Sequence, residues 1–545
     1  MGLTDALFTG TSGLRSLGHG MSVVGDNVAN LNTTAFKASR ISFSDIMAQS
    51  INTAAGSGQL GRGATLQALY PIFTQGSFES TANPTDLAIA GNGFFIVRDP
   101  RTTGNVFYTR DGQFMIDKNG YLVNPAGLRV QGWKIDEDTG DVTGVITDIQ
   151  IERSSPPVKT SLIDVITNLN AEVERTITID TAGGTPSTDD DVTFLDNDIT
   201  DNNNLTLFKK WDATLTTPLA ATDYDYKTPL YVYDSLGTPH EITVYYKAVN
   251  LVKTDETTPV YEFLVTCNPE EDMRRNADGT DLGSKKGVLM YGILEFDTQG
   301  NVKNFLNVYR YGWDATNDQY QLVRIVDDTG IPQVTGLDDF ADSTYFTTTI
   351  GALGANGYPI FIADFLGIEV ADAAGNENPV ATQNLQPIEL NFGYYYDGSS
   401  WRFETVRTTQ YSSPFATLFY DQNGFEPGTL ESIAVDNEGR ITGYYSNGRV
   451  IPLWMVALAN FNAPERLQKV GGNLYKETTY SGPPVTGKPG TNGLGSIAPY
   501  SIEQSNVDIG EQFVKLIIFQ RGFQADARII TVSDSMLEEL INLKR

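Results

Sequence analysis

Few side chains in this sequence have the type and spacing of a catalytic or metal-binding group. The acidic run at 187–204 contains Asp196, Asp198, Asp201 and Asn203, whose side-chain oxygens are the ligands that Ca²⁺ prefers. An EF-hand loop also requires Gly at its sixth position and Glu at its twelfth, and this run has neither. We therefore interpret the run as a solvated acidic loop and predict no metal site.

The two histidines and the one cysteine are equally poor candidates for a site. His19 and His240 lie in different predicted domains, so they cannot share a metal ion or a catalytic proton. Cys267 excludes an internal disulfide, and its place at the end of a predicted strand favours a buried thiol. The sequence contains no nucleophile elbow, Walker loop or His-Glu-x-x-His motif. It therefore predicts neither an enzyme nor a bound cofactor.

A glycine-rich stretch at 51–69 matches the dinucleotide-binding pattern in form. The match is Gly56-x-Gly58-x-x-Gly61. The pattern requires a strand before it and a helix after it, and the sequence predicts neither. We interpret residues 51–69 as a flexible connector.

Composition restricts the class of protein further. The chain has 545 residues with 38 Lys plus Arg against 67 Asp plus Glu, a net charge of −29. Such a surface repels nucleic acid and anionic lipid. The sequence has no apolar run of 18 residues and no basic-then-apolar start, so we predict neither membrane insertion nor a cleaved signal peptide. Abundant Gly, Thr, Val, Ile and Tyr in the middle of the chain favour β-structure.

Both ends of the chain carry an apolar stripe whose members alternate at spacings of four and three. This spacing predicts a helix at each end with a narrow, coiled-coil-like seam. The predicted seam residues are Leu3, Leu7, Leu14, Leu17, Met21, Val24, Val28 and Leu31 in the first helix, and Ile509, Phe513, Leu516, Phe523, Ala527, Ile530, Leu537 and Ile541 in the second. Glycines within the first stripe weaken that helix in isolation, each by roughly 1 kcal/mol relative to Ala. We therefore expect the helices to pair with each other and with copies of the chain.

Two local predictions follow for the second helix. The sequence SNVD at 505–508 predicts an N-cap provided by Ser505 or Asn506. Phe523 lies at the centre of the stripe and Phe519 lies off it, so we expect assembly to depend on Phe523 more than on Phe519.

Two longer stretches carry a family resemblance. DNVANLNTTAFKASR at 26–40 and SNVDIGEQFVKLIIFQRGFQADARIITVSDSMLEELINL at 505–543 resemble the signatures at the two ends of the bacterial flagellar rod and hook proteins. The matching residues are Asn27, Asn30, Asn32, Phe36 and Lys37 in the first stretch, and Asn506, Asp508, Gln520, Arg521 and Gln524 in the second. Asp526 stands where the family usually has Asn. The resemblance implies that both terminal helices form an inner tube wall, and that the Asn-rich segment makes turns and contacts between subunits.

The body of the chain divides in a nested order. NPTDLAIAGNGFF at 83–95 is similar to the first body domain of that family, and the matching half lies far away, within 405–502. We therefore predict a mainly β, multidomain protein with nested, discontinuous domains. The predicted parts are a helical inner core (1–50 and 503–545), the connector (51–69), a β-rich body domain (70–145 and 401–502), an outer β domain (146–305 and 386–400) and an additional outer lobe (306–385).

The segment inserted between the two halves of the body domain, residues 146–400, indicates which branch of the family the chain resembles. YVYDSLGTPHEITVYY at 231–246 and ILEFDTQGNVKNF at 293–305 resemble the outer domain of hook proteins, which rod proteins lack. The resemblance implies a structural subunit of the flagellar hook, a self-assembling curved, flexible tube that transmits torque from the rod and motor to the filament. The alternatives are a distal rod protein, or a secreted β-rich adhesin or carbohydrate-binding protein.

The resemblance also implies partners and a location. The partners are copies of the chain, the distal rod protein, the hook cap, the hook–filament junction proteins and the flagellar type III export apparatus. The location is the extracellular hook of the flagellum, reached without a cleaved signal peptide.

Overall fold

The chain forms two compact units in the computed structural model. Unit 1 comprises residues 1–155 and 429–545, and unit 2 comprises residues 156–428. The structure describes residues 2–542 apart from 48, 54–55, 103, 138, 176, 181–205, 254–255, 277–279, 315–318, 328, 333–350 and 368–384. The acidic run at 187–204 lies outside the described residues. Long helices at both ends of the chain and β-sheets between them confirm the predicted fold class.

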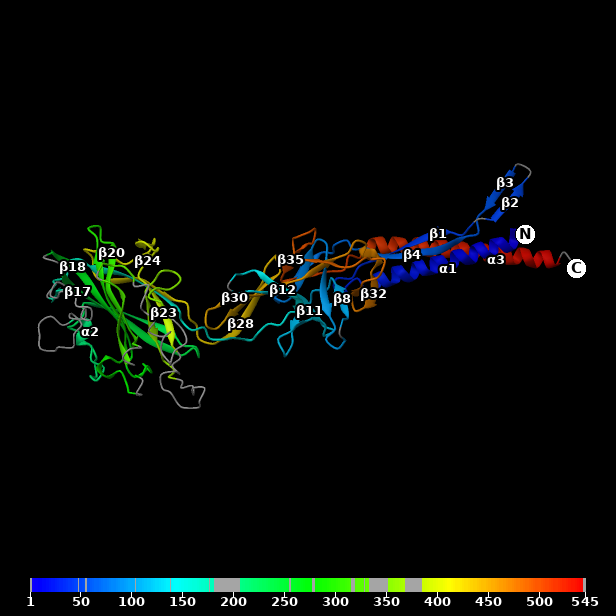
Figure 1. The fold of residues 1–545 in the computed structure, drawn as a ribbon. Helices are drawn as coiled ribbons and strands as arrows, with labels where there is room; N and C mark the ends of the chain where they lie inside the picture. Colours follow the sequence, from blue (N-terminus) through cyan, green and yellow to red (C-terminus); the bar gives the residue numbers. More distant parts are fainter. Residues whose placement is uncertain are drawn as a thin grey trace. The chain divides into compact units, whose positions relative to one another are not determined.

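The two long helices of unit 1 lie side by side and run antiparallel (Figure 1). They are α1 (Gly2–Ala29) and α3 (Ile509–Asn542). The glycines of α1 explain how closely they pack. A β-carbon at Gly20 would come within 3.0 Å of the Phe519 ring, and one at Gly13 within 2.1 Å of the Asp526 carboxylate. The residues that weaken α1 in isolation therefore allow α3 to approach it.

Strands occupy the predicted connector at 51–69 and the residues just before it. They are β1 (Ser39–Asp45), β2 (Gln49–Thr53), β3 (Gly56–Leu60) and β4 (Ala64–Pro71). β1 pairs with β4 and β2 pairs with β3, both antiparallel, and β1 and β4 also pack on α1. The Gly56-x-Gly58 pattern lies within the β2–β3 hairpin, so its glycines belong to a hairpin rather than to a flexible linker.

Unit 1 also contains a large sheet assembled from both of its chain segments. The strands on its main path, in spatial order, are β13 (Ser154–Ser155), β28 (Gly428–Val435), β29 (Arg440–Tyr445), β30 (Val450–Val456), β11 (Arg129–Ile135), β7 (Phe94–Arg98), β8 (Val106–Thr109), β33 (Leu474–Lys476) and β32 (Gln468–Gly471). The strands off this path are β9 (Met115–Ile116), β10 (Leu122–Val123), β12 (Val142–Asp148), β31 (Leu458–Asn460) and β34 (Val485–Gly487). Two short antiparallel pairs complete the unit: β5 (Phe78–Ser80) with β36 (Ser501–Glu503), and β6 (Leu87–Ala90) with β35 (Ser496–Pro499).

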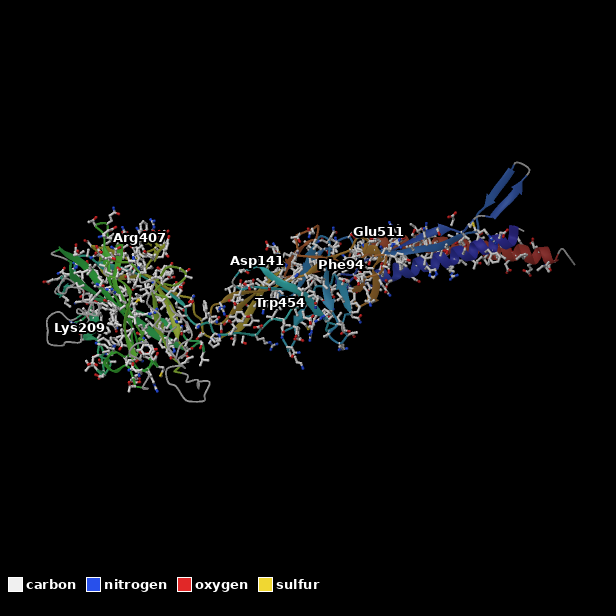
Figure 2. All side chains as sticks on the ribbon, in the orientation of Figure 1. Phe94, Asp141, Lys209, Arg407, Trp454 and Glu511 are labelled. Carbon is white, nitrogen blue, oxygen red and sulfur yellow. The ribbon has the colours of Figure 1, made fainter. Side chains whose placement is uncertain are left out.

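Side chains from both chain segments share the core of this unit. One cluster includes Leu87, Phe95, Val130, Ile441, Trp454 and Ile497, and another includes Phe94, Tyr108, Phe461 and Tyr475. Figure 2 labels Phe94 and Trp454, one from each cluster and one from each chain segment. Neither segment can therefore complete its core without the other.

Unit 2 consists mainly of two sheets. The first contains β22 (Ile360–Ala363), β23 (Gln386–Asn391), β14 (Leu162–Asn170), β26 (Thr409–Tyr411) and β27 (Ala416–Gln422). The second contains β15 (Ile177–Asp180), β16 (Tyr226–Tyr233), β17 (Pro239–Lys253), β18 (Glu256–Cys267), β19 (Val288–Phe296), β20 (Val302–Asp314) and β21 (Gln319–Val326). A smaller ribbon pairs β24 (Tyr394–Tyr396) with β25 (Trp401–Phe403).

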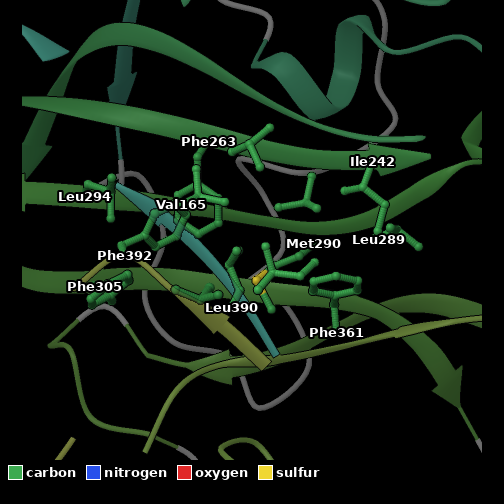
Figure 3. Close-up of a cluster of buried hydrophobic side chains, with 14 of the residues drawn as sticks. Val165, Ile242, Phe263, Leu289, Met290, Leu294, Phe305, Phe361, Leu390 and Phe392 are labelled. Atoms are coloured by element: carbon green, nitrogen blue, oxygen red, sulfur yellow. The ribbon is translucent and has the colours of Figure 1, made fainter. Parts of the chain in front are cut away.

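The core of unit 2 lies between its two sheets. Val165 and Leu390 from the first sheet pack against Phe263, Leu294 and Phe305 from the second (Figure 3). The short helix α2 (Leu207–Lys210) and the residues around it cover the opposite face of the second sheet, where Leu207 packs near Tyr291. Both faces of the second sheet are therefore covered, and every residue of its central strand β19 is buried.

The described part of 306–385 does not form a separate lobe. β20 and β21 extend the second sheet, and β22 pairs with β23 in the first. This differs from the sequence-based prediction because pairing between remote strands decides where each strand lies, and no local pattern reports that pairing.

Candidate assembly interface

Large apolar side chains line the surface of α3 that does not face α1. We use the name outer stripe for five of these residues: Val514, Ile518, Ile529, Val532 and Met536. Val514 and Ile518 leave 58% and 59% of their surface exposed. Fully burying a side chain of this kind stabilises by about 1.5–3 kcal/mol, so exposed apolar side chains that recur along one side of a helix mark an interaction surface.

The predicted seam residues fall into two groups. In α1 and the turn after it, Val24 is buried, Leu7, Leu14, Leu17, Met21, Val28 and Leu31 are half-buried, and the side chain of Leu3 lies outside the described residues. In α3, Leu516, Ala527, Ile530 and Leu537 are half-buried, and Ile509, Phe513, Phe523 and Ile541 are exposed. The exposed members belong to the surface that remains free for a partner. Their contact with other copies stays a prediction.

The face of α3 that packs on α1 is offset by one residue from much of the predicted stripe. Gln512, Gly522 and Asp526 approach α1, whereas the predicted stripe contains the residue after each of them; Phe519, which was expected off the stripe, also approaches α1. Gln512 and Asp526 are polar and Gly522 has no side chain. A search for apolar residues therefore selects their neighbours, although Ile530 belongs to both sets.

The Asn-rich segment forms a junction at the end of α1. Asn27 is buried, and its Oδ1 accepts from the backbone N–H of Ser39 at 2.8 Å. Its Nδ2 donates to the Ser39 carbonyl at 3.0 Å and to Oε1 of Gln512 at 3.1 Å. One amide therefore connects the last turn of α1, the start of β1 and the first turn of α3. An asparagine amide can do this because it carries both donors and an acceptor.

A buried ionic cluster lies next to this junction. Lys37 Nζ donates to Glu503 Oε1 at 2.6 Å and to the Thr74 carbonyl at 2.8 Å. Arg110 Nη1 lies 3.5 Å from the other carboxylate oxygen, and the Gly76 N–H donates to Oε1 at 2.8 Å. Burial lowers the pKa of Lys37, and the Glu503 carboxylate opposes that shift. Removing one member of this cluster would leave the others charged and buried, which strongly destabilises a protein.

The first turn of α3 is capped by Asp508. Its Oδ1 accepts from the backbone N–H of Glu511 at 3.1 Å, one of the donors that a helix leaves free at its N-terminus. Figure 2 labels Glu511 at this end of α3. The prediction that Ser505 or Asn506 caps the helix is wrong, because α3 begins at Ile509, directly after Asp508.

Asn506 instead connects three segments of backbone. Its Oδ1 accepts from the Ala38 N–H at 2.8 Å, and its Nδ2 donates to the carbonyls of Ile72 and Thr74 at 2.8 and 3.1 Å. It therefore holds the chain that leads into α3 against the segments that flank β1 and β4.

The remaining motif residues differ in burial. Asn30 donates to the Asp26 carbonyl at 2.9 Å, and the Lys469 ammonium lies 5.1 Å from the centre of the Phe36 ring. The exposed members are Asn32, Gln520, Arg521 and Gln524. The motif thus divides into residues that build the junction within the chain and residues on the surface.

The cysteine and the two histidines, the residues considered above as candidates for chemistry, do not come together in a site. Cys267 is a buried free thiol, as predicted, and burial raises the pKa of that thiol. His240 lies between Glu271 and Asp234, at 2.7 and 3.3 Å, whereas His19 belongs to unit 1. Within the described ranges, no cluster of His, Cys, Asp and Glu is placed to hold a metal ion. A search of the described helices likewise finds none apolar enough to cross a membrane.

Three family models match successive parts of the chain. They are the Flagellar hook protein FlgE/F/G D1 domain over 88–184, the Flagellar basal body protein FlaE D2 domain over 201–425 and the Flagellar basal body rod FlgEFG protein C-terminal over 498–543. A helix pair, a body built from two remote segments and an inserted β-domain, together with these matches, define an axial protein of the bacterial flagellum.

Full-length relatives identify the branch. The flagellar hook protein FlgE of Borreliella burgdorferi is 31% identical over 557 residues, which cover 99% of each chain. The flagellar hook protein FlgE of Treponema pallidum is 29% identical over 554 residues, again 99% of each chain. The crystal structure of Helicobacter pylori flagellar hook protein FlgE2 has a TM-score of 0.40 and 15% identity, and the match covers 77% of this chain and 98% of that one. The chain belongs to the flagellar hook protein FlgE family.

Family membership confirms the predicted hook subunit and its association with the flagellum. Proteins of this family are structural and self-assembling, so the chain is not an enzyme. The alternative of a secreted adhesin is thereby removed.

Proposed function

We propose that copies of this chain assemble through their helix pairs into the inner wall of a curved, flexible tube. The body of unit 1 and the β-domain of unit 2 surround that wall. The tube acts as a universal joint that carries torque from the rod and motor to the filament.

The outer stripe of α3 is the observation that supports this proposal. Its five apolar side chains leave 45–59% of their surface exposed, so burying the rest is worth roughly half of the 1.5–3 kcal/mol of a whole side chain. Together they reach the lower part of the roughly 4–15 kcal/mol that association costs in lost freedom of motion. A helix pair that presents this stripe is therefore a favourable element for self-assembly.

The apolar surface of the helix pair and the acidic surface of the outer domains suit different mechanical tasks. Apolar contacts between closely packed helices resist rearrangement, which suits an inner wall that carries torque. The net charge of −29 disfavours tight contacts between outer surfaces, so outer domains of neighbouring copies slide as each row of subunits shortens and lengthens during rotation.

The family resemblance supplies the other partners of the proposal. The tube begins on the distal rod protein, grows under the hook cap and ends at the hook–filament junction proteins. The chain reaches this extracellular site through the flagellar type III export apparatus.

Electron microscopy of polymer grown from the purified full-length chain tests the proposal. We expect curved tubes from the wild type and no tubes from Val514→Asp, because the substitution places a charge in the stripe. The melting temperature of the Val514→Asp monomer should be unchanged. Gln524→Asp is the matched control: it adds the same charge at an exposed position of α3 outside the stripe. Straight rods from the wild type, or normal tubes from Val514→Asp, would contradict the proposal.

A further inference from the structure

A groove of about 590 Å³ lies between α1 and the β1–β4 segment of unit 1. Its cationic side chains are Arg15 and Arg62, and His19 lies beside them. Its large apolar side chains are Phe8, Ile46 and Leu66. The remaining described lining residues are Ala, Ser and Thr, so the groove combines apolar and basic character without a carboxylate.

The α3 of the same chain cannot fill this groove. Gly10, Gly13 and Gly20 face α3, since a β-carbon at each would meet an α3 residue. Successive residues of a helix turn by about 100°, which places Arg15 and His19 on the opposite side of α1. The occupant must therefore come from another molecule.

The distal half of α3 has the complementary character. Ile529, Val532 and Met536 form the last part of the outer stripe, and all three are exposed. Glu539 follows Met536 by three residues, so it lies on the same side of α3 as the stripe, and it is also exposed. One turn of helix, about 10 Å wide and 5.4 Å long, occupies roughly 420 Å³, which is compatible with the volume of the groove.

We propose that the groove of one copy receives the distal outer stripe of α3 from another copy. Met536 packs among the apolar side chains of the groove, and Glu539 lies near Arg15 and Arg62. The inference rests on the proposed function and adds to it a heterologous contact, in which one surface binds a different surface of its neighbour. Such contacts propagate into helical polymers, whereas a self-complementary contact closes at a dimer.

Charge reversal tests the ionic part of the contact. We expect Arg15→Glu with Arg62→Glu to raise the concentration needed for polymerisation roughly five- to tenfold, and Glu539→Arg to raise it in the same way. Combining the three substitutions should restore assembly because opposite charges again face each other. All three residues are exposed, so the monomer should melt as the wild type does. Failure of the combined variant to recover would overturn the pairing.

Cysteine cross-linking tests the position of the contact. Cys267 is buried, so oxidation reports on introduced thiols alone. Polymer of Leu66→Cys with Met536→Cys should give a ladder of covalent multimers, and its dilute monomer should give none. Leu69→Cys with Met536→Cys is the matched control, since Leu69 is an exposed leucine of β4 that does not line the groove. Tubes without the ladder would overturn this inference and leave the proposed function intact, whereas no tubes from the wild type would overturn both.

Discussion

Strand β19 of unit 2 and helix α3 of unit 1 use their apolar residues in opposite ways. Every residue of β19 is buried, with one face against the first sheet and the other against the segment around α2. In α3, the face toward α1 contains Gln512, Gly522 and Asp526, and the large apolar side chains of the outer stripe are exposed. Unit 2 therefore completes its core within the chain, whereas the helix pair does not.

This difference separates the parts of the molecule that fold from the part that assembles. Unit 2 should gain little from neighbouring copies, because its apolar side chains already have partners. The helix pair should gain much, because a glycine-rich helix is unstable until its exposed face is covered. The following predictions test that separation, beginning with the largest change.

Removal of unit 2 should leave unit 1 folded and able to assemble. Ser155 and Thr429 lie on the paired strands β13 and β28, and the Leu430 N–H donates to the Arg153 carbonyl at 2.8 Å. A short Gly-Ser linker can therefore replace residues 156–428. We expect calorimetry to show the loss of one thermal transition, and electron microscopy to show thinner tubes.

A smaller deletion, 306–385, is the contrasting variant: it removes β21 and β22 and should unfold unit 2. A folded, soluble product without tubes from the larger deletion would show that unit 2 is required for assembly.

Breaking the ionic cluster should destabilise unit 1 more than any change on its surface. Glu503→Gln leaves Lys37 and Arg110 buried without their carboxylate, and we expect a loss of about 3–5 kcal/mol. Lys37→Met leaves Glu503 its contacts with Arg110 and the Gly76 N–H, so the loss should be smaller, roughly 1–3 kcal/mol. Chemical denaturation of both variants measures the difference. Equal losses would mean that Arg110 does not stabilise the carboxylate.

The stability of unit 2 should fall as the pH rises from about 4.5 to about 7. Burial raises the pKa of Glu262 from 4.5 to about 7, and this carboxyl accepts from the Leu207 N–H and the Tyr291 hydroxyl. Between these values the unfolded chain has lost the proton that the folded chain keeps, so ionisation favours unfolding. The full effect is on the order of 3 kcal/mol. Glu262→Gln cannot ionise and should flatten this part of the profile, as thermal melts at several pH values would reveal. A variant as pH-dependent as the wild type would assign the effect to another group.

Sequence patterns predicted the parts of this fold that depend on neighbours along the chain. Spacings of four and three located both terminal helices, and the two halves of the body motif indicated that unit 1 is discontinuous. The buried ionic cluster of Lys37, Arg110 and Glu503 could not be predicted from such patterns. Lys37 and Glu503 are 466 residues apart, and a lysine in a polar segment does not reveal which carboxylate it meets.

Predictions of side-chain position on α3 were less successful for a related reason. Helix packing here requires small or polar residues such as Gly522 and Asp526 where α1 approaches closely, so the apolar stripe is not the internal face. Residues 306–385 were assigned to an additional lobe because the partners of their strands are remote in sequence. Both errors concern the question of which surfaces pack against each other. Local composition does not contain that information.

Phe519 and Phe523 lie one turn apart on the same side of α3 and differ in how much of each ring is covered, so they allow a pair of matched substitutions. Phe519 lies against Gly20 and meets the edge of the Phe43 ring at a centroid distance of 6.2 Å, whereas Phe523 is 37% exposed. We now expect Phe519→Ala to weaken the helix pair in the monomer by about 1–2 kcal/mol, since aromatic pairing and part of the buried area are lost.

Phe523→Ala should change the stability of the monomer by less than about 0.5 kcal/mol, the range usual for surface positions. Its effect should appear in assembly, as shorter or fewer tubes at a given concentration. Hydrogen exchange of α1 and α3 amides in the monomer, combined with tube length by microscopy, separates the two effects. Faster exchange in Phe519→Ala with unchanged exchange in Phe523→Ala would show that Phe519 packs within the helix pair and that Phe523 stays available to another copy, as their contacts and exposure indicate. Faster exchange in Phe523→Ala with normal tubes would mean that this ring packs within its own chain, and the exposed seam would then lose its central residue.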